Sequence, residues 1–589
     1  MARRHTVNPG DWSSLARRLD ELISAQSGED PFEEALTLMV AKLAHERGLG
    51  GGVGFAPPSV DLLLERAAEA WPGLLTRAAT SRLPGAALGR CVALLAPVDL
   101  HADHLAGLDA MFECIVNKAS KGQKGQYFTP RDVVSAVVEM MELAPGERVA
   151  DPACGSGAFL RHALMARPAC EVLGFDQDTR AVQVARVMMA ASDRASECIT
   201  RIDSLDRTDV AIGGGYDVIL TNPPFAGDVG AAFSSAYALG TGHRAERDAL
   251  FLERCVELLR PGGRLAIVLP YNKLGGAAWS HLRRWLLCHA RVVGVLGLGR
   301  NTFLPHTSQK ACVVIATRRA TVLEGPPPDE EIVFYESVRD GKDARGRPCG
   351  DNDLSEATDA IRAALRGAPF VVSDSRVVVR SIGHLASGLI LAPERYDGRR
   401  SLRQTGGTVL SELVELAVET ARVSEDSPAL VLDTGHVEEG FVRVVQPVKL
   451  VGRFGSLKRV LSAGDVIVSR LRPYLRQVAY LDAGCFVLRA GGNSVVASTE
   501  FYVLRGRGDE DVAWLVPFLL SEPIQAALAA AQEGGHHPRV SREALLSVVV
   551  PEEVLRERRS LGASARGACA AMRAASDTIS AAVELARGR

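Results

Sequence analysis

Apolar side chains recur every three or four positions in the first part of the chain, over about residues 12–111. The segment DPFEEALTLMVAKLAHERGL shows the pattern well, with Leu36, Met39 and Leu43 at this spacing. Such a period places apolar residues on one face of a helix. It predicts a helical N-terminal domain, which we assign to residues 1–118.

The pattern changes over about residues 131–320 to short apolar runs that alternate with helical segments. The runs read RVADPACGSG, CEVLGFD, YDVILTNPPF, GRLAIVLP, RVVGVLGL and KACVVIAT. This alternation is typical of an α/β domain with a doubly wound parallel sheet. A Pro- and charge-rich stretch, EGPPPDEE, and a loop-like stretch, DGKDARGRPCGDND, follow the last run. We assign residues 119–370 to this domain.

A third pattern begins after about Ser381. New strand-like runs, GDVIVSRLRPYLRQVAYL, CFVLRAG, STEFYVLRG and LSVVVP, are mixed with helical segments, which predicts an α+β domain at residues 385–550. The closing residues 551–589 are alanine-rich with helical spacing, and we expect a helix there that packs or dimerises.

Composition limits the class of protein. A chain of 589 residues with 47% hydrophobic residues should form several domains. A net charge of -2 argues against non-specific coating of nucleic acid. The 11 cysteines lack metal-ligand spacing, so we expect reduced thiols and no metal. No apolar run reaches about 18 residues, so we expect no membrane-spanning helix. The start lacks the apolar core of a signal peptide, so we expect a cytoplasmic protein.

A glycine-rich turn follows the first predicted strand, in VADPACGSGAFLRHAL. The strand leads through Asp151 to Gly155 and Gly157 and then into a helix. In a doubly wound sheet this turn is where a nucleotide-like ligand binds, because glycines let the ligand approach backbone N–H groups. A plain tight turn between strand and helix is the alternative. Cys154 lies inside the turn, and we interpret it as a small buried residue without a covalent role.

Acidic residues end the next two predicted strands. Asp176 follows the turn by about 20 residues, where an acid accepts hydrogen bonds from ribose hydroxyls; Asp178 is the competing choice and better suited to cap the next helix. Asp203, in TRIDSLD, is placed to accept from an adenine amino group. These acids favour an adenosine-containing ligand. The turn is GSG rather than GxGxxG, and no GxxxxGK[ST] loop occurs, so neither NAD nor ATP is expected.

The combination of DPACGSGAFL with the later NPPF resembles S-adenosylmethionine-dependent amino-methyltransferases that act on adenine in DNA, of the gamma class. The upstream KGQYFTPR narrows the resemblance to the modification subunit of type I restriction systems. It implies a Rossmann-like methyltransferase domain with S-adenosyl-L-methionine as cofactor, and an aromatic loop that closes over its methionine end. The implied cofactor residues are Gln126, Tyr127, Phe128, Thr129, Pro130, Arg131, Asp151, Pro152, Ala153, Gly155, Ser156, Gly157, Asp176, Asp203 and Ser204.

Without the resemblance, the aromatic loop is a turn before a helix. Thr129 would then be the N-cap and Pro130 would take the first helical position.

The TNPPF motif supplies the expected catalytic residues, Asn222, Pro223, Pro224 and Phe225. Methyl transfer to an amine requires orientation of that amine. Asn222 offers a side-chain carbonyl, and Pro224 restricts the preceding residue so that the backbone carbonyl of Pro223 is rigidly aimed. Phe225 would stack on a base swung out of the duplex. The alternative is a strand-terminating turn, since Asn-Pro often starts one.

The C-terminal runs resemble one target-recognition domain of type I specificity subunits, which usually carry two. Residues 453–476 hold six basic side chains and one acidic one, and arginine forks onto guanine edges or phosphates; a solvated strand face is the alternative. We expect double-stranded DNA as partner and a homodimer joined through the C-terminal helices. The expected DNA contacts are Arg470, Arg472, Tyr474, Arg476 and Arg539.

The sequence thus predicts a site-specific methyltransferase for N6 of adenine in double-stranded DNA, within a restriction-modification or phage-defence system. No ATP loop or convincing nuclease motif is visible, so cutting would need a separate restriction nuclease or motor subunit. Two alternatives stay open. One is a sequence-specific DNA-binding or regulatory module without turnover, and the other is an RNA or protein methyltransferase, because similar Asn-Pro-Pro-aromatic motifs occur there.

Overall fold

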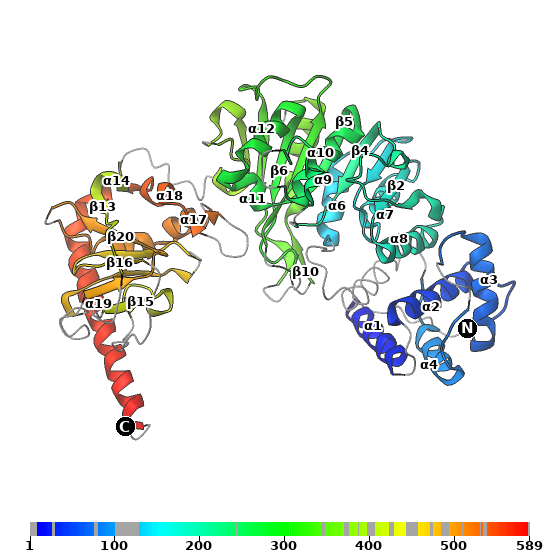
Figure 1. Cartoon of the computed structure of the whole chain (residues 1–589), viewed down its shortest axis with the longest axis horizontal. Coiled ribbons are helices and arrows are strands. Elements are labelled where there is room, and N and C mark those ends of the chain that lie inside the picture. Colours follow the sequence, from blue (N-terminus) through cyan, green and yellow to red (C-terminus); the bar gives the residue numbers. More distant parts are fainter. Residues whose placement is uncertain are drawn as a thin grey trace. The chain divides into compact units, whose positions relative to one another are not determined.

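The alternating strands and helices of the middle of the chain form one mixed sheet in the computed structural model (Figure 1). The model describes residues 9–586 except for the segments 26–29, 76–79, 101–128, 226, 228, 242–244, 305–306, 308, 344–347, 370–375, 387, 397–406, 423–428, 443–456, 472–474, 485–493, 509, 531 and 534–538. It divides into unit 1, residues 1–274 and 278–391, and unit 2, residues 275–277 and 392–589.

The sheet of unit 1 has the strand order β11-β8-β6-β7-β5-β4-β1-β2-β3. From β1 to β5, neighbouring strands are parallel, as predicted for a doubly wound fold. The strands are β1 (Arg148–Asp151), β2 (Glu171–Asp176), β3 (Ile199–Arg201), β4 (Tyr216–Thr221), β5 (Leu259–Pro270), β6 (Ala290–Gly297), β7 (Ala311–Arg318), β8 (Glu331–Glu336) and β11 (Val377–Ser381).

The prediction of a parallel sheet is wrong for β7, and the unpredicted strand β11 is antiparallel as well. β7 lies antiparallel between β5 and β6, and β11 lies antiparallel to β8. β7 pairs with β6, the strand just before it in the chain. A simple loop return joins antiparallel neighbours, whereas a parallel neighbour needs a crossover, usually through a helix. The local sequence KACVVIAT is equally suitable for either direction.

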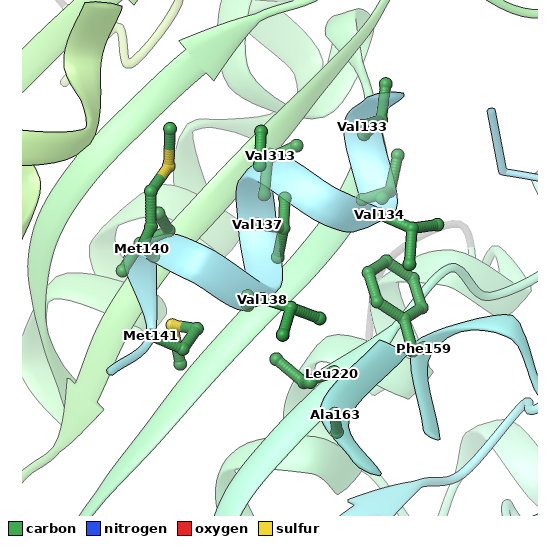
Figure 2. Packing of buried hydrophobic residues seen from close by; sticks show 14 of the residues in the cluster. Val133, Val134, Val137, Val138, Met140, Met141, Phe159, Ala163, Leu220 and Val313 are labelled. Atoms are coloured by element: carbon green, nitrogen blue, oxygen red, sulfur yellow. The ribbon is translucent and has the colours of Figure 1, made fainter. Parts of the chain in front are cut away.

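Helices cover both faces of this sheet. α6 (Arg131–Met140), α7 (Ala158–Ala166) and α13 (Thr358–Arg366) pack together on one face. Figure 2 shows Val134, Val137 and Val138 of α6 beside Phe159 of α7 and Leu220 of β4. Successive strand residues face opposite sides of a sheet, so Ile219, the buried residue before Leu220 in β4, faces the layer of helices on the opposite side. That layer contains α10 (Arg247–Leu258) and α12 (Ser280–His289), which contact β5 and β6.

The N-terminal residues form four helices within the described part: α1 (Pro9–Ser24), α2 (Pro31–Glu46), α3 (Val60–Ala70) and α4 (Gly85–Leu95). Their core includes Val184, Val187 and Met188 of α8 (Thr179–Ala191). Arg180 of α8 also pairs with Asp30, the N-cap of α2, at 2.6 Å. The N-terminal helices therefore pack against the sheet domain through α8.

Unit 2 has two four-stranded sheets, ordered β13-β20-β17-β18 and β14-β16-β19-β15. The first contains β13 (Val414–Leu416), β17 (Val466–Ser469), β18 (Val478–Tyr480) and β20 (Phe501–Gly506); the second contains β14 (Thr420–Ala421), β15 (Ala429–Leu432), β16 (Lys458–Val460) and β19 (Ser494–Ala497). In addition, β12 (Gly407–Val409) pairs with β23 (Val549–Pro551). The helices of unit 2 include α16 (Leu515–Leu520), α17 (Glu522–Ala530), α18 (Arg542–Leu546) and the 35-residue α19 (Glu552–Ala586).

The predicted α+β texture and closing helix are both present. The predicted run CFVLRAG lies outside the described residues. Within the part of the chain that the structure describes, no helix is both long and apolar enough to cross a membrane.

Candidate active site at the ends of β1 and β4

The chain order reverses between β1 and β4, which lie side by side in the sheet. β1 pairs with β2 on one side and with β4 on the other, where Val149 is opposite Val218 and Ala150 opposite Ile219. In open α/β sheets a crevice forms at such a switch point, outside the carboxyl ends of the strands. The glycine turn after β1 and the TNPPF motif after β4 therefore meet at one edge, although they are far apart in sequence.

The glycine turn bends the chain from β1 into α7. Gly155 and Gly157 have φ angles of 53° and 81°, in the left-handed region that disfavours other residues. The Cys154 N–H donates to the Phe175 carbonyl at 2.9 Å, which fixes the turn against β2. Cys154 itself is 5% exposed, and burial raises the pKa of its thiol well above the ordinary value. The interpretation of Cys154 as a buried residue is confirmed.

Two carboxyl groups line the turn. Asp151 is buried and accepts from the Ala153 N–H at 3.1 Å; burial raises its pKa to about 7. Asp176 accepts from the Gly155 N–H at 3.0 Å and from the Asp178 N–H at 2.9 Å, and burial raises its pKa to about 6. A cationic ligand at the turn would favour the charged forms of both groups.

Asp178 has the capping role predicted for it. Its side chain accepts from the N–H groups of Arg180 and Ala181 at the start of α8. Asp176 is thus the acid at the turn, and Asp178 serves the helix.

The loop after β3 joins the same site. The Ser204 hydroxyl donates to the Pro152 carbonyl at 2.6 Å, and the Asp203 side chain accepts from the Leu205 N–H at 3.1 Å. The bond from Ser204 ties the third strand end to the glycine turn. Asp151, Asp176 and Asp203 therefore end three neighbouring strands around one turn, as expected for a nucleoside-binding edge.

The start of α6 contacts the TNPPF motif directly. The Asn222 side-chain amide donates to the Thr129 hydroxyl at 2.9 Å. The prediction that Thr129 is the N-cap is wrong: α6 begins at Arg131, Pro130 is its N-cap, and no side chain caps it. Because its hydroxyl bonds Asn222, Thr129 links the segment KGQYFTPR to the motif. Gln126, Tyr127 and Phe128 lie outside the described residues.

Phe225 packs against a residue that the sequence analysis missed. Its ring is 4% exposed and meets Phe303 edge to face, with ring centroids 5.6 Å apart and an interplanar angle of 71°. Phe303 follows the carboxyl end of β6. Because β7 is antiparallel to both β5 and β6, these two strands run in the same direction and end at the same edge of the sheet. An aromatic residue just after a predicted strand, in GRNTFLP, was the available signal.

The candidate DNA contacts in unit 2 fall into two groups. Glu500 lies between two of them: Arg539 forms two hydrogen bonds to its carboxylate, at 2.9 and 3.1 Å, and Arg470 lies 3.6 Å from it. Arg476 instead donates to the Leu520 carbonyl at 2.6 Å and pairs with Glu439 at 3.0 Å. The structure thus brings Arg470 and Arg539 together and holds Arg476 elsewhere. Arg472 and Tyr474 lie outside the described residues.

Among the described residues, no group of three or more His, Cys, Asp or Glu side chains is placed to hold a metal ion. The site consists of a glycine turn, strand-end acids and an amide-proline motif on one doubly wound sheet. These features define a class, the methyltransferase domains that use a nucleoside cofactor.

Residues 105–371 match the model of the family N-6 DNA Methylase. The match covers less than half of the chain and makes this segment similar to N-6 DNA methylases, enzymes whose methyl donor is S-adenosylmethionine.

Individual known proteins are similar to this chain in the same region. The EcoEI methylase subunit of a type I restriction enzyme from Escherichia coli is 26% identical over 248 residues, which cover 40% of this chain and 49% of that protein. The type II methyltransferase M.VspI from Vibrio sp. (strain 343) is 26% identical over 203 residues, or 33% of this chain and 49% of that protein. The chain therefore spans about half the length of these curated relatives.

A solved structure is similar over more of the chain. The type IIG restriction endonuclease BpuSI aligns with a TM-score of 0.52 and 14% identity, and covers 94% of this chain and 74% of its own. At this identity the likeness is one of fold.

Proposed function

We propose that this chain transfers a methyl group from S-adenosylmethionine to N6 of adenine in double-stranded DNA. The observation that carries the proposal is the bond from Asn222 to Thr129, at the edge where β1 and β4 end side by side. It joins the amide-proline motif to the segment before α6, next to the glycine turn. The match to N-6 DNA methylases supports adenine as the target.

The residues around the turn fit the cofactor. S-adenosylmethionine carries its methyl group on a positively charged sulfur, which is a good leaving group, so no covalent enzyme intermediate is needed. Asp151 and Asp176 provide two acids whose charged forms a cation would stabilise. The glycines leave room for close approach, and Asp176 and Asp203 would accept from the ribose and adenine. Gly155, Ser156 and Gly157 would line the turn around the ligand.

The work of the chain is to orient the target amine. The nitrogen lone pair of adenine's amino group is delocalised into the ring, so acceptors must draw its N–H bonds out of that geometry. The Asn222 side-chain carbonyl and the Pro223 backbone carbonyl would accept these two N–H groups, while Thr129 holds the opposite end of the Asn222 amide. Positioning of this kind accounts for much of enzymatic rate enhancement. The proton lost from the methylated nitrogen passes to solvent.

Unit 2 would supply target recognition. Its Arg539 is oriented by two hydrogen bonds to Glu500, and Arg470 lies 3.6 Å from the same carboxylate. Oriented arginines can form the paired hydrogen bonds that distinguish guanine in the major groove. Arg476 is held by Leu520 and Glu439, and we assign it a structural role within unit 2.

We further propose that two copies assemble through α19. The last turns of this helix carry exposed Met572, Ile579 and Val583, which are 43, 65 and 42% exposed and lie seven and four positions apart. Apolar residues at this spacing form a stripe suited to a second helix. A dimer would read a two-part or palindromic site with two copies of one recognition domain.

We place the protein in the cytoplasm, in a restriction-modification or phage-defence system with a separate restriction subunit.

The test is transfer of a radioactive methyl group from S-adenosylmethionine to unmethylated plasmid DNA, RNA or protein, by the native chain and by Asn222→Ala. We expect methyladenine in DNA alone, and a loss on the order of a hundredfold or more in the variant, similar to the removal of one transition-state hydrogen bond. Both proteins should bind DNA and cofactor. Label in RNA or protein, or an Asn222→Ala protein with full activity, would contradict the proposal.

A further inference from the structure

A small two-stranded sheet, β9 (Asp340–Lys342) with β10 (Pro348–Asn352), contacts two elements that pack against the TNPPF motif, the turn after β6 and the start of α6. The sequence of this stretch predicts an exposed loop. In the sheet, Lys342 is opposite Pro348 and Asp340 is opposite Asn352. The methyl-transfer chemistry proposed above uses none of these residues.

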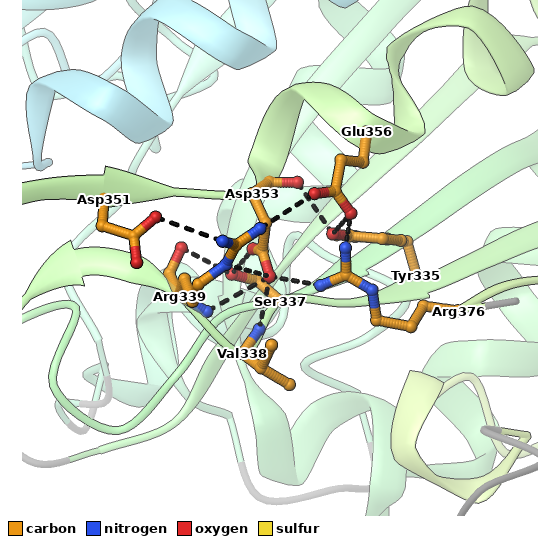
Figure 3. A network of polar contacts seen from close by, with 8 residues as sticks. All are labelled: Tyr335, Ser337, Val338, Arg339, Asp351, Asp353, Glu356 and Arg376. Atoms are coloured by element: carbon orange, nitrogen blue, oxygen red, sulfur yellow. Dashed lines mark hydrogen bonds and ion pairs between the residues drawn. The ribbon is translucent and has the colours of Figure 1, made fainter. Parts of the chain in front are cut away.

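A buried polar network fixes the root of the β9–β10 sheet (Figure 3). Asp353, 1% exposed, accepts from the Ser337 hydroxyl at 2.6 Å and from the N–H groups of Val338 and Arg339 at 3.1 and 3.2 Å. The Asp353 N–H returns a bond to the Arg339 carbonyl at 3.0 Å. These contacts join the residues just before β9 to the residue just after β10.

Arg376 completes the network from the start of β11. It forms ion pairs with Asp353 and Glu356, and its guanidinium lies over the Tyr335 ring, 5.3 Å from the centroid. A buried carboxylate is costly unless it is paired and hydrogen-bonded, and Asp353 meets both conditions. The root of the β9–β10 sheet is therefore rigidly attached to the main sheet.

The first flank is reached through Lys342. Its ammonium group donates to the Leu304 carbonyl at 2.9 Å. Leu304 directly follows Phe303, which is 1% exposed and packs edge to face on Phe225 of the motif. A shift of the Leu304 carbonyl would move Phe303, and the close packing would transmit the movement to Phe225.

The second flank is reached through Gly341. Its φ is +78°, and a Cβ atom there would lie 2.2 Å from a carboxylate oxygen of Asp132. Asp132 belongs to the first turn of α6, three positions after Thr129, which accepts the hydrogen bond from Asn222. Adjacent residues of one short strand thus contact the elements that hold both Phe225 and Asn222.

We propose that the β9–β10 sheet braces the pocket for the target adenine and that Lys342 is a positioning residue for Phe303 and Phe225. The inference rests on the proposed function, because the pocket has meaning only for an enzyme that holds a base. Lys342 would act through the Leu304 carbonyl and not on the base or the cofactor directly. Its hydrogen bond to the Leu304 carbonyl holds the turn after β6 in the position in which Phe303 packs against Phe225.

The experiment compares Lys342→Met with Lys342→Arg in the full chain. Methionine has a similar length but cannot donate to the Leu304 carbonyl, whereas arginine can. We expect Lys342→Met to lower kcat for DNA methylation on the order of tenfold, since small misplacements of reacting groups are costly, with an unchanged dissociation constant for S-adenosylmethionine and an unchanged thermal midpoint. Lys342→Arg should restore most of kcat. The control is Arg380→Met, which removes an exposed side chain that also donates to a backbone carbonyl.

Gly341→Ala tests the other flank, where the added methyl group must displace Asp132; we expect a fall in kcat here too. The inference is wrong if Lys342→Met and Gly341→Ala keep the native kcat. It is also wrong if Lys342→Met loses kcat, cofactor affinity and thermal stability together, because Lys342 would then serve general stability. A native chain that transfers no methyl group to DNA would instead reject the proposed function, before any variant is compared.

Discussion

Replacement of Thr129 by valine separates two roles that this residue could have. Valine keeps the shape of threonine but removes the hydroxyl that accepts from the Asn222 amide at 2.9 Å. If Thr129 capped α6, its loss would cost about 1 kcal/mol of stability. Since Pro130 is the N-cap and no side chain caps this helix, we expect little change in the free energy of unfolding.

The effect of Thr129→Val should appear in catalysis. A hydrogen bond of this kind contributes about 0.5–1.5 kcal/mol net. If that energy serves to orient Asn222 in the transition state, kcat should fall by a factor of about 2 to 12, since about 1.4 kcal/mol corresponds to tenfold. Steady-state methylation of plasmid DNA measures the rate, and urea unfolding measures stability.

A double-mutant cycle sharpens this prediction. In the Asn222→Ala background Thr129 has no amide to orient, so Thr129→Val should have no further effect on kcat. The matched control is Thr37→Val on α2, where the hydroxyl donates to the Glu33 carbonyl at 2.8 Å, far along the chain from the site. Equal losses of kcat from Thr129→Val in both backgrounds, or a loss of stability with normal kcat, would contradict this role of Thr129.

Two further predictions concern the cofactor and the assembly. Burial raises the pKa of Asp176 to about 6. At pH values between its ordinary pKa and about 6, this carboxyl group is protonated in the native state and ionised in the unfolded state. The free energy of unfolding should therefore fall as the pH rises through that window. The ionised carboxylate accepts ribose hydroxyls better, so the dissociation constant for S-adenosylmethionine, measured by calorimetry, should fall as the pH rises through about 6; Asp176→Asn should flatten this dependence, and an unchanged profile would contradict it. For the assembly, Ile579→Asp should convert dimers into monomers of 62.8 kDa in light scattering, whereas Val322→Asp, at an exposed position of unit 1, should not; a native chain that is already monomeric would contradict the dimer.

The parts of the fold that local patterns encode were predictable. Strands β1, β2, β4, β5, β6 and β7 all coincide with predicted apolar runs, because buried strands need continuous apolar residues. The glycine turn and TNPPF could be placed at one edge, since both follow strands of a doubly wound sheet. The cap at Asp178 was also local, as its side chain bonds the next residues of its own helix.

The parts that failed depend on contacts between distant segments. The direction of β7 is set by its partner strands, β5 and β6, rather than by its own residues. Thr129 bonds Asn222 instead of capping its helix, and a Thr-Pro sequence alone favours the cap. Phe303 and Phe225 are far apart in the sequence, and the order of the strands in the sheet brings their rings together. The partners of Arg476, Glu439 and the Leu520 carbonyl, also come from distant segments, so the basic stretch alone could not predict them.

The proposed activity of this chain is methylation of adenine at a defined DNA sequence. The most direct measurement is single-molecule sequencing of DNA from a methylation-free host that expresses this chain, in parallel with a host that expresses Asn222→Ala. We expect N6-methyladenine at one motif, two-part or palindromic if α19 pairs two copies, and no modified base with the variant. Unmodified DNA from cells that contain the folded native chain, or modification that persists with Asn222→Ala, would contradict it.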